Sequence, residues 1–285
     1  MEVHTPYRLS PKYHKLFEDT NSAEEEKINV IFDEYVEGFK KPENKYLEKI
    51  KLYYDKEVRL ADDTVKLIFD FFKAKHLYEN TYFIITSDHG EGFAEHTGNL
   101  KHSAYFYEEN LKVPLIIHSH KLNSKTLEKP VCHLDIAPTI LSLAGGERRA
   151  DFRGMDLLGD LPDKRKIHFE TIHDRRGNAY VAENKESKSY YTLGLLDYPY
   201  KYIFSSKHNK EELYNITKDE KTNVLDSLNI EESKLAEEYR KETTERLASV
   251  KGIPSKNREI SDKDKQTDKD EEKVKEKLRQ LGYLD

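Results

Sequence analysis

Two short apolar runs, residues 81–86 and 112–117, restrict the folds open to this chain more than any other feature. The first reads Thr-Tyr-Phe-Ile-Ile-Thr and the second Lys-Val-Pro-Leu-Ile-Ile, without polar alternation. Runs of this length and composition are typical of strands that are buried on both faces. Before them, from about residue 42 to residue 75, apolar residues recur at three- and four-residue steps, which predicts an amphipathic helix. Helix, buried strand, loop and buried strand in this order indicate a layered α/β domain.

Further elements follow from capping residues and apolar periodicity. We expect a surface helix over residues 22–41, with Ser22 at its N-cap. Another helix is entered through Asp135 and stops at Gly145. Short strand-like runs between residues 166 and 205 predict a small antiparallel sheet, and a helix follows near residues 230–250. The apolar stripe of the long helix comprises Tyr54, Val58, Ala61, Val65, Ile68 and Phe72.

These elements predict three parts. Residues 1–160 form an α/β core that carries the candidate ligand loops, and residues 161–250 form the antiparallel sheet with its helix. Residues 251–285 form a charged tail, which is almost wholly polar and has little capacity to bury surface.

The composition excludes several classes of function. Charged residues make up 36% of the chain and hydrophobic residues 36%, so a densely charged surface must surround a modest core. A formal charge of −6 gives no basic field for nucleic acid. Cys132 is the single cysteine, which rules out an internal disulfide and fits a reducing compartment. Because no run approaches the roughly 20 apolar residues of a membrane span and no apolar signal core opens the chain, we expect a cytoplasmic location.

Acidic and imidazole side chains follow directly after the first apolar run. Asp88 and His89 leave the predicted strand at its carboxyl end, the edge at which open parallel sheets bind ligands. Gly90 eases the turn, so that both side chains can approach one point. A carboxylate oxygen and an imidazole nitrogen suit a divalent ion such as zinc or manganese. The simpler alternative is a turn and helix-capping device, and a metal site would need further ligands from elsewhere.

The order of several motifs resembles the sulfatase family, within the alkaline phosphatase superfamily. The segment from Tyr54 to His96 is similar to the family's long helix and metal-bearing strand. Phe-Tyr-Glu-Glu-Asn-Leu-Lys-Val-Pro-Leu-Ile-Ile, then His-Leu-Asp-Ile-Ala-Pro-Thr-Ile-Leu-Ser-Leu-Ala-Gly, resemble the stretches that follow it, and Val-His-Thr-Pro-Tyr resembles its His-x-Pro-Tyr loop. The likeness covers roughly residues 1–250. It implies part of an alkaline-phosphatase-like layered sheet with flanking helices, plus a small carboxy-terminal antiparallel sheet.

The resemblance implies roles for four residues. Asp88 and His89 match the family's paired metal ligands. His102 falls where relatives carry a histidine or lysine that contacts the transferred group or protonates the leaving oxygen. His4 matches the histidine of the His-x-Pro-Tyr loop, which lines the same pocket. A divalent ion and imidazole donors stabilise the charge that sulfate or phosphate esters carry as the bond breaks.

The family's nucleophile has no counterpart in this sequence. The resemblance implies a Cys-x-Pro-x-Arg motif, whose cysteine is oxidised to formylglycine, or a serine or threonine equivalent, before the His-x-Pro-Tyr loop. Cys132 lies in Val-Cys-His-Leu-Asp, without the required proline and arginine. We therefore expect a carboxy-terminal fragment of a metal-dependent sulfuric, phosphoric or phosphonic ester hydrolase, inactive alone. Its expected partner is a missing amino-terminal half.

Two other functions stay open at this point, a non-catalytic binding or assembly remnant and one half of a split phosphoethanolamine-type transferase. The expected substrate is a small-molecule or glycan ester, and the sequence does not decide between sulfate and phosphate. Because imidazole is a softer ligand than oxygen, we favour manganese or zinc as the cofactor, with calcium as the alternative.

Neighbouring polar residues have simpler interpretations. We expect His96 to be a surface residue near the pocket mouth, and Glu91 to orient His89. Glu108 and Glu109 are interpreted as hydrogen-bonding residues that hold the loop, rather than as acid–base groups. Asp135 is interpreted as a helix cap rather than a ligand.

Overall fold

A computed structural model of the chain describes residues 3, 4, 7, 22–38, 43–96, 100, 102, 105–147, 149–173, 190–207 and 209–251. The chain forms two compact units, residues 1–239 and 240–285. All the sites described below lie in the first unit. The boundaries expected at residues 160 and 250 stay predictions. Apart from Lys251, the predicted charged tail (residues 251–285) lies outside the described residues.

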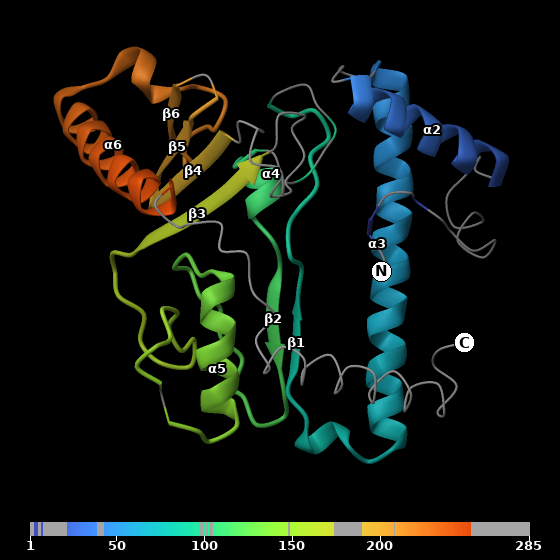
Figure 1. Ribbon diagram of the computed structural model, residues 1–285. Coiled ribbons are helices and arrows are strands. Elements are labelled where there is room, and N and C mark those ends of the chain that lie inside the picture. The colour runs from blue at the N-terminus through green and yellow to red at the C-terminus, as the bar shows by residue number, and fades with distance from the viewer. Residues whose placement is uncertain are drawn as a thin grey trace, which may run out of the picture. The chain divides into compact units, whose positions relative to one another are not determined.

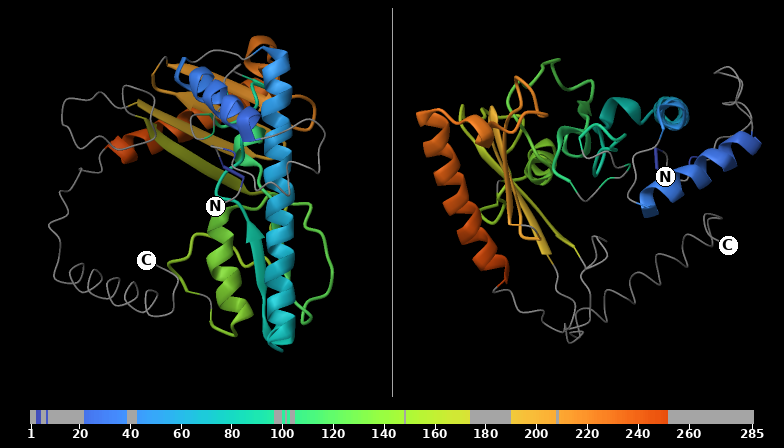
Figure 2. Two further views of the ribbon diagram at one scale, coloured as in Figure 1. Left: turned by 90° about the vertical axis from the view of Figure 1, so that its right-hand side faces the viewer. Right: turned by 90° about the horizontal axis from the view of Figure 1, so that it is seen from above.

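Two helices open the described structure, as the periodicity predicts (Figure 1). Helix α2 spans Ser22–Gly38, and α3 spans Asn44–Ala74. The two helices lie side by side at the amino-terminal end of α3, as both views in Figure 2 show. Their apolar side chains meet in a buried cluster with residues from outside the helices, which holds Tyr7 near Phe93 and Leu100. The cluster contains Tyr7, Ile28, Phe32, Leu47, Ile50, Tyr53, Phe93 and Leu100.

The predicted apolar stripe of α3 is only partly covered. Phe69 and Phe72 pack their rings against Phe83, with centroid distances of 4.5 and 5.2 Å. Val58 and Ile68, which belong to the predicted stripe, are exposed. A 3.6-residue period identifies which side chains are apolar, but it does not say which element covers them.

The two apolar runs form strands, and these pair antiparallel. Strand β1 (Phe83–Thr86) and strand β2 (Leu115–His118) align with Phe83 opposite His118 and Thr86 opposite Leu115. The open parallel sheet from which the ligand edge was inferred is therefore not formed by this pair. Among the described residues between the two strands, no helix is long enough for the crossover that parallel strands need. Among the described residues neither strand has a second neighbour, and Ile116 is exposed rather than buried.

The predicted carboxy-terminal antiparallel sheet is present. Its four strands are hydrogen-bonded in sequence order, and each adjacent pair is antiparallel. Helix α6 (Ile230–Lys251) packs Ala236 and Tyr239 against the sheet residues Leu195, Tyr202 and Leu213. One of the strand-like runs expected between residues 166 and 205, Ala-Tyr-Val-Ala-Glu at residues 179–183, lies outside the described residues. The strands are β3 (Lys166–His173), β4 (Tyr190–Asp197), β5 (Tyr200–Ser205) and β6 (Lys210–Asn215).

A short helix, α5 (Ile136–Leu143), has Asp135 at its N-cap position and is followed by Gly145 at φ 75°, as its sequence predicts. The Asp135 carboxylate forms no cap hydrogen bond with α5, so its interpretation as a side-chain cap of this helix is wrong. The carboxylate is fully buried, accepts the Cys132 N–H at 2.8 Å, and forms a two-pronged ion pair with Arg165 at 2.6 and 2.7 Å. Asp135 therefore links the turn before α5 to the segment that leads into β3.

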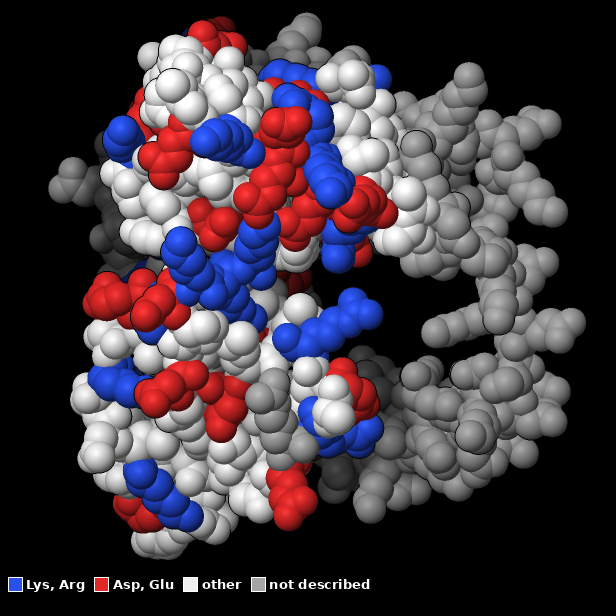
Figure 3. Space-filling model, turned by 90° about the vertical axis from the view of Figure 1, so that its left-hand side faces the viewer, with Lys and Arg blue, Asp and Glu red and all other residues white. Residues whose placement is uncertain are grey.

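The surface is densely charged, as the composition predicts. On the face drawn in Figure 3, Lys and Arg side chains lie beside Asp and Glu side chains rather than in a separate basic field. Among the described residues, no helix combines the length and the apolar character that a bilayer crossing requires.

Candidate active site

The loop after β1 is held in a tight turn by backbone contacts. The Ser87 hydroxyl donates to the His89 carbonyl at 2.7 Å, and the Gly90 N–H donates to the Asn110 carbonyl at 2.8 Å. A Cβ atom on Gly90 would lie 2.0 Å from the carbonyl oxygen of Glu109. Only glycine therefore allows the loop to approach helix α4 (Glu108–Leu111) this closely.

Replacing Gly90 with alanine is expected to lower the free energy of unfolding by about 1–3 kcal/mol, because the loop and α4 must move apart. Urea denaturation of the full chain measures this loss. Gly159→Ala is the matched control, since the nearest atom to its Cβ lies 3.6 Å away. An equal loss in both variants would show that the close approach at Gly90 is unimportant.

Asp88 and His89 lie at the end of β1 with their ligand atoms facing each other. The His89 Nδ1 atom lies 2.8 Å from the Gly90 carbonyl oxygen, which can only accept, so Nδ1 carries the proton. This tautomer leaves the Nε2 lone pair toward Asp88 Oδ2, at 3.8 Å. The Asp88 side chain is 81% exposed and that of His89 33%. A backbone carbonyl that orients a metal-binding histidine in this way is common, so the pair fits a divalent ion.

The pKa of the Asp88 carboxyl is lowered. Slight burial acts to raise this pKa, but the neighbouring His89 and hydrogen bonds from backbone N–H groups and Ser87 outweigh it. Asp88 is therefore an anion at neutral pH, as a metal ligand must be.

The other two predicted site residues lie beside His89. The His102 ring stacks on His89 with centroids 4.1 Å apart and planes 16° apart, and His4 approaches His102 at 5.2 Å. The structure thus brings Asp88, His89, His102 and His4 together from segments that are far apart in the sequence. Their catalytic and metal-binding roles stay predictions.

Glu91 orients His102 rather than His89, so the sequence-based expectation is wrong on this point. The His102 Nδ1 atom lies 3.1 Å from Glu91 Oε1, and the Glu91 side chain is buried. Because the carboxylate holds Nδ1, the opposite nitrogen, Nε2, faces away from Glu91. The turn at Gly90 carries Glu91 away from His89, whose own Nδ1 is occupied by a backbone carbonyl.

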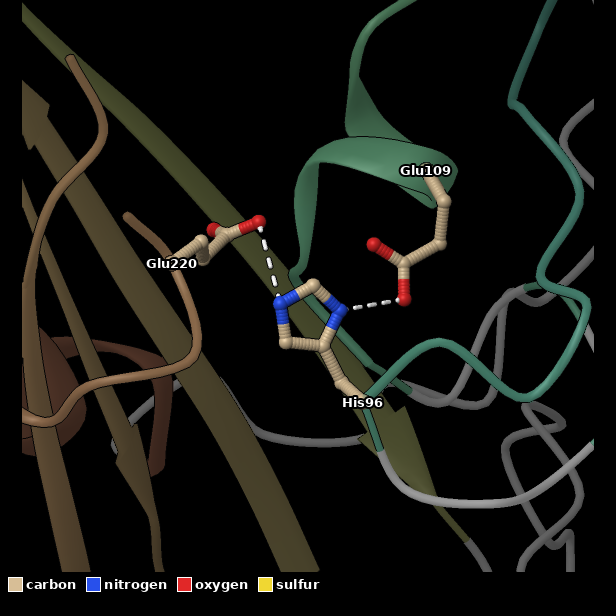
Figure 4. A group of neighbouring side chains, drawn as sticks. All are labelled: His96, Glu109 and Glu220. Carbon is tan, nitrogen blue, oxygen red and sulfur yellow. Dashed lines mark hydrogen bonds and ion pairs between the residues drawn. The ribbon is translucent and has the colours of Figure 1, made fainter. Parts of the chain in front are cut away.

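His96 is largely buried, contrary to the expected surface position. Its side chain is only 12% exposed and stacks on Tyr107 with centroids 4.3 Å apart. The His96 Nδ1 atom lies 2.8 Å from Glu109 Oε1, and Nε2 lies 3.7 Å from Glu220 Oε2 (Figure 4). Among the described residues this is the one group of three His, Cys, Asp or Glu side chains whose ligand atoms converge.

Glu108 and Glu109 form loop-holding contacts, in agreement with their interpretation from sequence. Glu109 binds His96, and Glu108 accepts from the buried Lys201 ammonium at 2.9 Å. Lys201 also forms an ion pair with Glu220. No local pattern connects Lys201 or Glu220 to this network, because both lie about 100 residues or more further along the chain.

Cys132 does not lie in a reactive environment. It is half-buried, and burial raises the pKa of its thiol, with the Asp135 carboxylate adding to the effect. A thiol of this kind is a poor nucleophile, which agrees with the absence of a nucleophile motif around it.

Comparison with known families identifies the chain. The profile described as Sulfatase matches residues 1–146, and the one described as N-sulphoglucosamine sulphohydrolase, C-terminal, matches residues 98–252. The chain belongs to the sulfatase family. The predicted fold class is also confirmed, because solved sulfatase structures have the same architecture as this sulfatase-family chain.

Several relatives illustrate the likeness. Delta 4,5-hexuronate-2-O-sulfatase of Bacteroides thetaiotaomicron is 33% identical over 150 residues, which cover 49% of this chain and 29% of the relative. A solved structure of a 2-O GAG sulfatase matches with a TM-score of 0.54 and 23% identity, covering 73% of this chain and 44% of that one. The phosphonate monoester hydrolase of Silicibacter pomeroyi matches with a TM-score of 0.57 and 17% identity, over 77% and 44%. The chain thus spans less than half the length of these three proteins.

Proposed function

We propose that this chain supplies the carboxy-terminal part of a metal-dependent sulfatase that hydrolyses glycan sulfate esters. The observation that carries the proposal is the convergence of His4, Asp88, His89 and His102 at one point. Relatives named as a hexuronate-2-O-sulfatase and a 2-O GAG sulfatase support a sulfated glycan as the substrate. The alternative, a phosphoric or phosphonic ester, draws support from the fold shared with a phosphonate monoester hydrolase.

In this proposal Asp88 Oδ2 and His89 Nε2 hold a divalent ion, with manganese or zinc favoured over calcium. When bound, such an ion stabilises negative charge on the non-bridging oxygens of the ester. The remaining ligands come from outside the pair.

His102 is the group that contacts the ester or protonates its leaving oxygen. Glu91 holds the Nδ1 side of the ring, so Nε2 is directed to the substrate. His4 provides a further donor on the far side of His102.

A separate segment, or a separately encoded amino-terminal half, supplies the nucleophile. The only cysteine in the sequence lacks the nucleophile motif and is half-buried. Large apolar side chains on α3, on β2 and at α5 are exposed, which supports a partner that covers them. Soluble domains rarely leave large apolar patches uncovered. The exposed side chains are Leu67, Ile68 and Phe71 on α3, Ile116 on β2, and Leu134 and Ile140 at α5.

The test combines the full chain with the amino-terminal half of a sulfatase relative that carries the nucleophile, or with the polypeptide encoded upstream. Sulfate release from an unsaturated hexuronate 2-sulfate, an aryl sulfate and an aryl phosphonate is then measured with and without Mn²⁺ or Zn²⁺. We expect metal-dependent sulfate release from the combination and none from the chain alone. Turnover by the chain alone, or a combination that forms a stable complex without any turnover, would contradict the proposal.

A further inference from the structure

The buried group of His96, Glu109 and Glu220 has an electrostatic imbalance. The Glu109 carboxylate accepts from His96 Nδ1 at 2.8 Å, so Nδ1 carries the proton and the Nε2 lone pair is directed away from Glu109. That nitrogen is buried, has no hydrogen-bond partner, and faces Glu220 Oε2 at 3.7 Å. Two acceptors therefore face each other at a largely buried position, which is costly unless a positive species lies between them.

The separation of the two acceptors favours a metal ion over a proton. A proton on Nε2 would need a donor–acceptor distance of about 2.7–3.2 Å for a normal hydrogen bond. An ion at about 2.1 Å from both atoms would subtend an angle of about 120° across the observed 3.7 Å, close to a tetrahedral arrangement. The 3.7 Å between His96 Nε2 and Glu220 Oε2 is thus too long for a normal hydrogen bond and suits two atoms that coordinate one metal ion.

The residues behind both ligand atoms hold them in place. Glu109 fixes the ring orientation and tautomer of His96, in the arrangement typical of metal-bound histidine. Glu220 is fixed from two sides, because Lys201 pairs with Oε1 and the Glu108 N–H donates to Oε2 at 2.8 Å. Lys201 is directed to the carboxylate oxygen that does not face His96, which leaves Oε2 able to bind an ion.

The local charge also favours a cation. Glu108, Glu109 and Glu220 carry three negative charges, and Lys201 supplies one positive charge, while His96 is neutral in the tautomer described.

We propose that His96 Nε2 and Glu220 Oε2, with Glu109 as the orienting carboxylate, form a divalent-metal site for zinc-type ions, separate from the Asp88–His89 pair. Water fills the remaining coordination positions. The ion would tie the loop after β1 to the β6 side of the carboxy-terminal sheet, so its role is to stabilise the positions of α4 and the candidate active-site loop. Metal binding by His96 and Glu220 would not require sulfatase activity.

The experiment uses the full chain with Asp88→Asn and His89→Gln, which removes the other candidate ligands. Zinc bound per chain is measured by equilibrium dialysis and atomic absorption, and the thermal midpoint is followed with zinc. We expect one zinc ion per chain and a rise of about 5 °C at a hundredfold excess over Kd. Adding His96→Gln should abolish both effects, and Glu109→Gln should weaken binding about 10- to 100-fold. His120→Gln, an exposed histidine elsewhere, is the matched control.

A second measurement needs no variant. In ¹⁵N spectra of the histidine rings of the wild-type chain, zinc should shift His96 Nε2 while Nδ1 stays protonated. Failure to bind zinc, binding unaffected by His96→Gln, or a His96 ring that stays protonated on both nitrogens in excess zinc at pH 7 would each overturn the proposal. The last result would show that a proton, not a metal ion, lies between His96 Nε2 and Glu220 Oε2.

Discussion

Replacing Asp88 with asparagine is expected to lower kcat of the enzyme completed by its nucleophile-bearing segment about 10³-fold. Asparagine keeps the shape of the side chain but removes the negative charge that faces His89 Nε2. The expected loss lies in kcat rather than in assembly with the partner, because the Asp88 side chain is 81% exposed and an asparagine Oδ1 can still accept the His89 N–H that Asp88 Oδ1 accepts at 3.1 Å. Steady-state kinetics over a range of Mn²⁺ concentrations measure the effect.

Asp62→Asn is the matched control, since it makes the same chemical change on the surface of α3. It should leave kcat unchanged. If Asp88→Asn lost no more activity than Asp62→Asn, Asp88 would have no part in catalysis.

Replacing Arg165 with methionine is expected to lower the free energy of unfolding by about 3–5 kcal/mol. Arg165 is 12% exposed and forms both bonds of the ion pair with Asp135, which is fully buried. Methionine has a similar apolar length but no charge, so the Asp135 carboxylate stays buried without its partner. Urea denaturation of the full chain at neutral pH measures the loss.

The control for this change is Arg149→Met. Arg149 also forms a close ion pair, with Asp151, but both side chains are more than 60% exposed. Exposed pairs contribute about 0–1 kcal/mol, so this variant should be nearly as stable as the wild type. Similar losses in the two variants would contradict the importance assigned to the buried pair.

The same pair predicts a dependence on pH. Burial acts to raise the pKa of the Asp135 carboxyl, but hydrogen bonds from Arg165 and from backbone N–H groups outweigh it, and the pKa is lowered. A lowered folded-state pKa contributes stability that is complete above the unfolded value of about 4 and is lost as the pH falls through the folded value. In Arg165→Met the hydrogen bonds that lower the Asp135 pKa are partly removed, while burial still raises it. The folded-state pKa of Asp135 should therefore be higher in the variant, and the acid-induced loss of stability should begin at a higher pH. Denaturation curves between pH 3 and pH 7 test this, and unchanged acid sensitivity in the variant would contradict it.

The sequence predicted the composition of the candidate site better than its internal contacts. Asp88, His89, His102 and His4 could be named because they match motifs in a known order, and the structure brings them together. The partners of Glu91 and His96 could not be read in this way. Which imidazole Glu91 reaches depends on the turn at Gly90, and His96 is buried by Glu220 and Tyr107, which local periodicity does not connect to it.

The fold shows the same division. Local patterns predicted α2, α3, α6 and the antiparallel sheet, because capping residues and apolar periods act within a few residues. They did not predict that β1 and β2 pair antiparallel, which depends on the path of the loop between them. They also did not predict that Ile68 and Ile116 are exposed, since exposure depends on which other segments are present to cover them.

Paramagnetic broadening by Mn²⁺ tests the central claim most directly, because it detects even weak binding by the chain without its partner. The histidine ring resonances of the His96→Gln variant are followed during a Mn²⁺ titration, with Asp88→Asn added for comparison. A divalent ion held by Asp88 and His89 should broaden His89 first, then His102 and His4, and Asp88→Asn should remove this order. Broadening that begins at His118 and His120, or that is the same with and without Asp88, would contradict it.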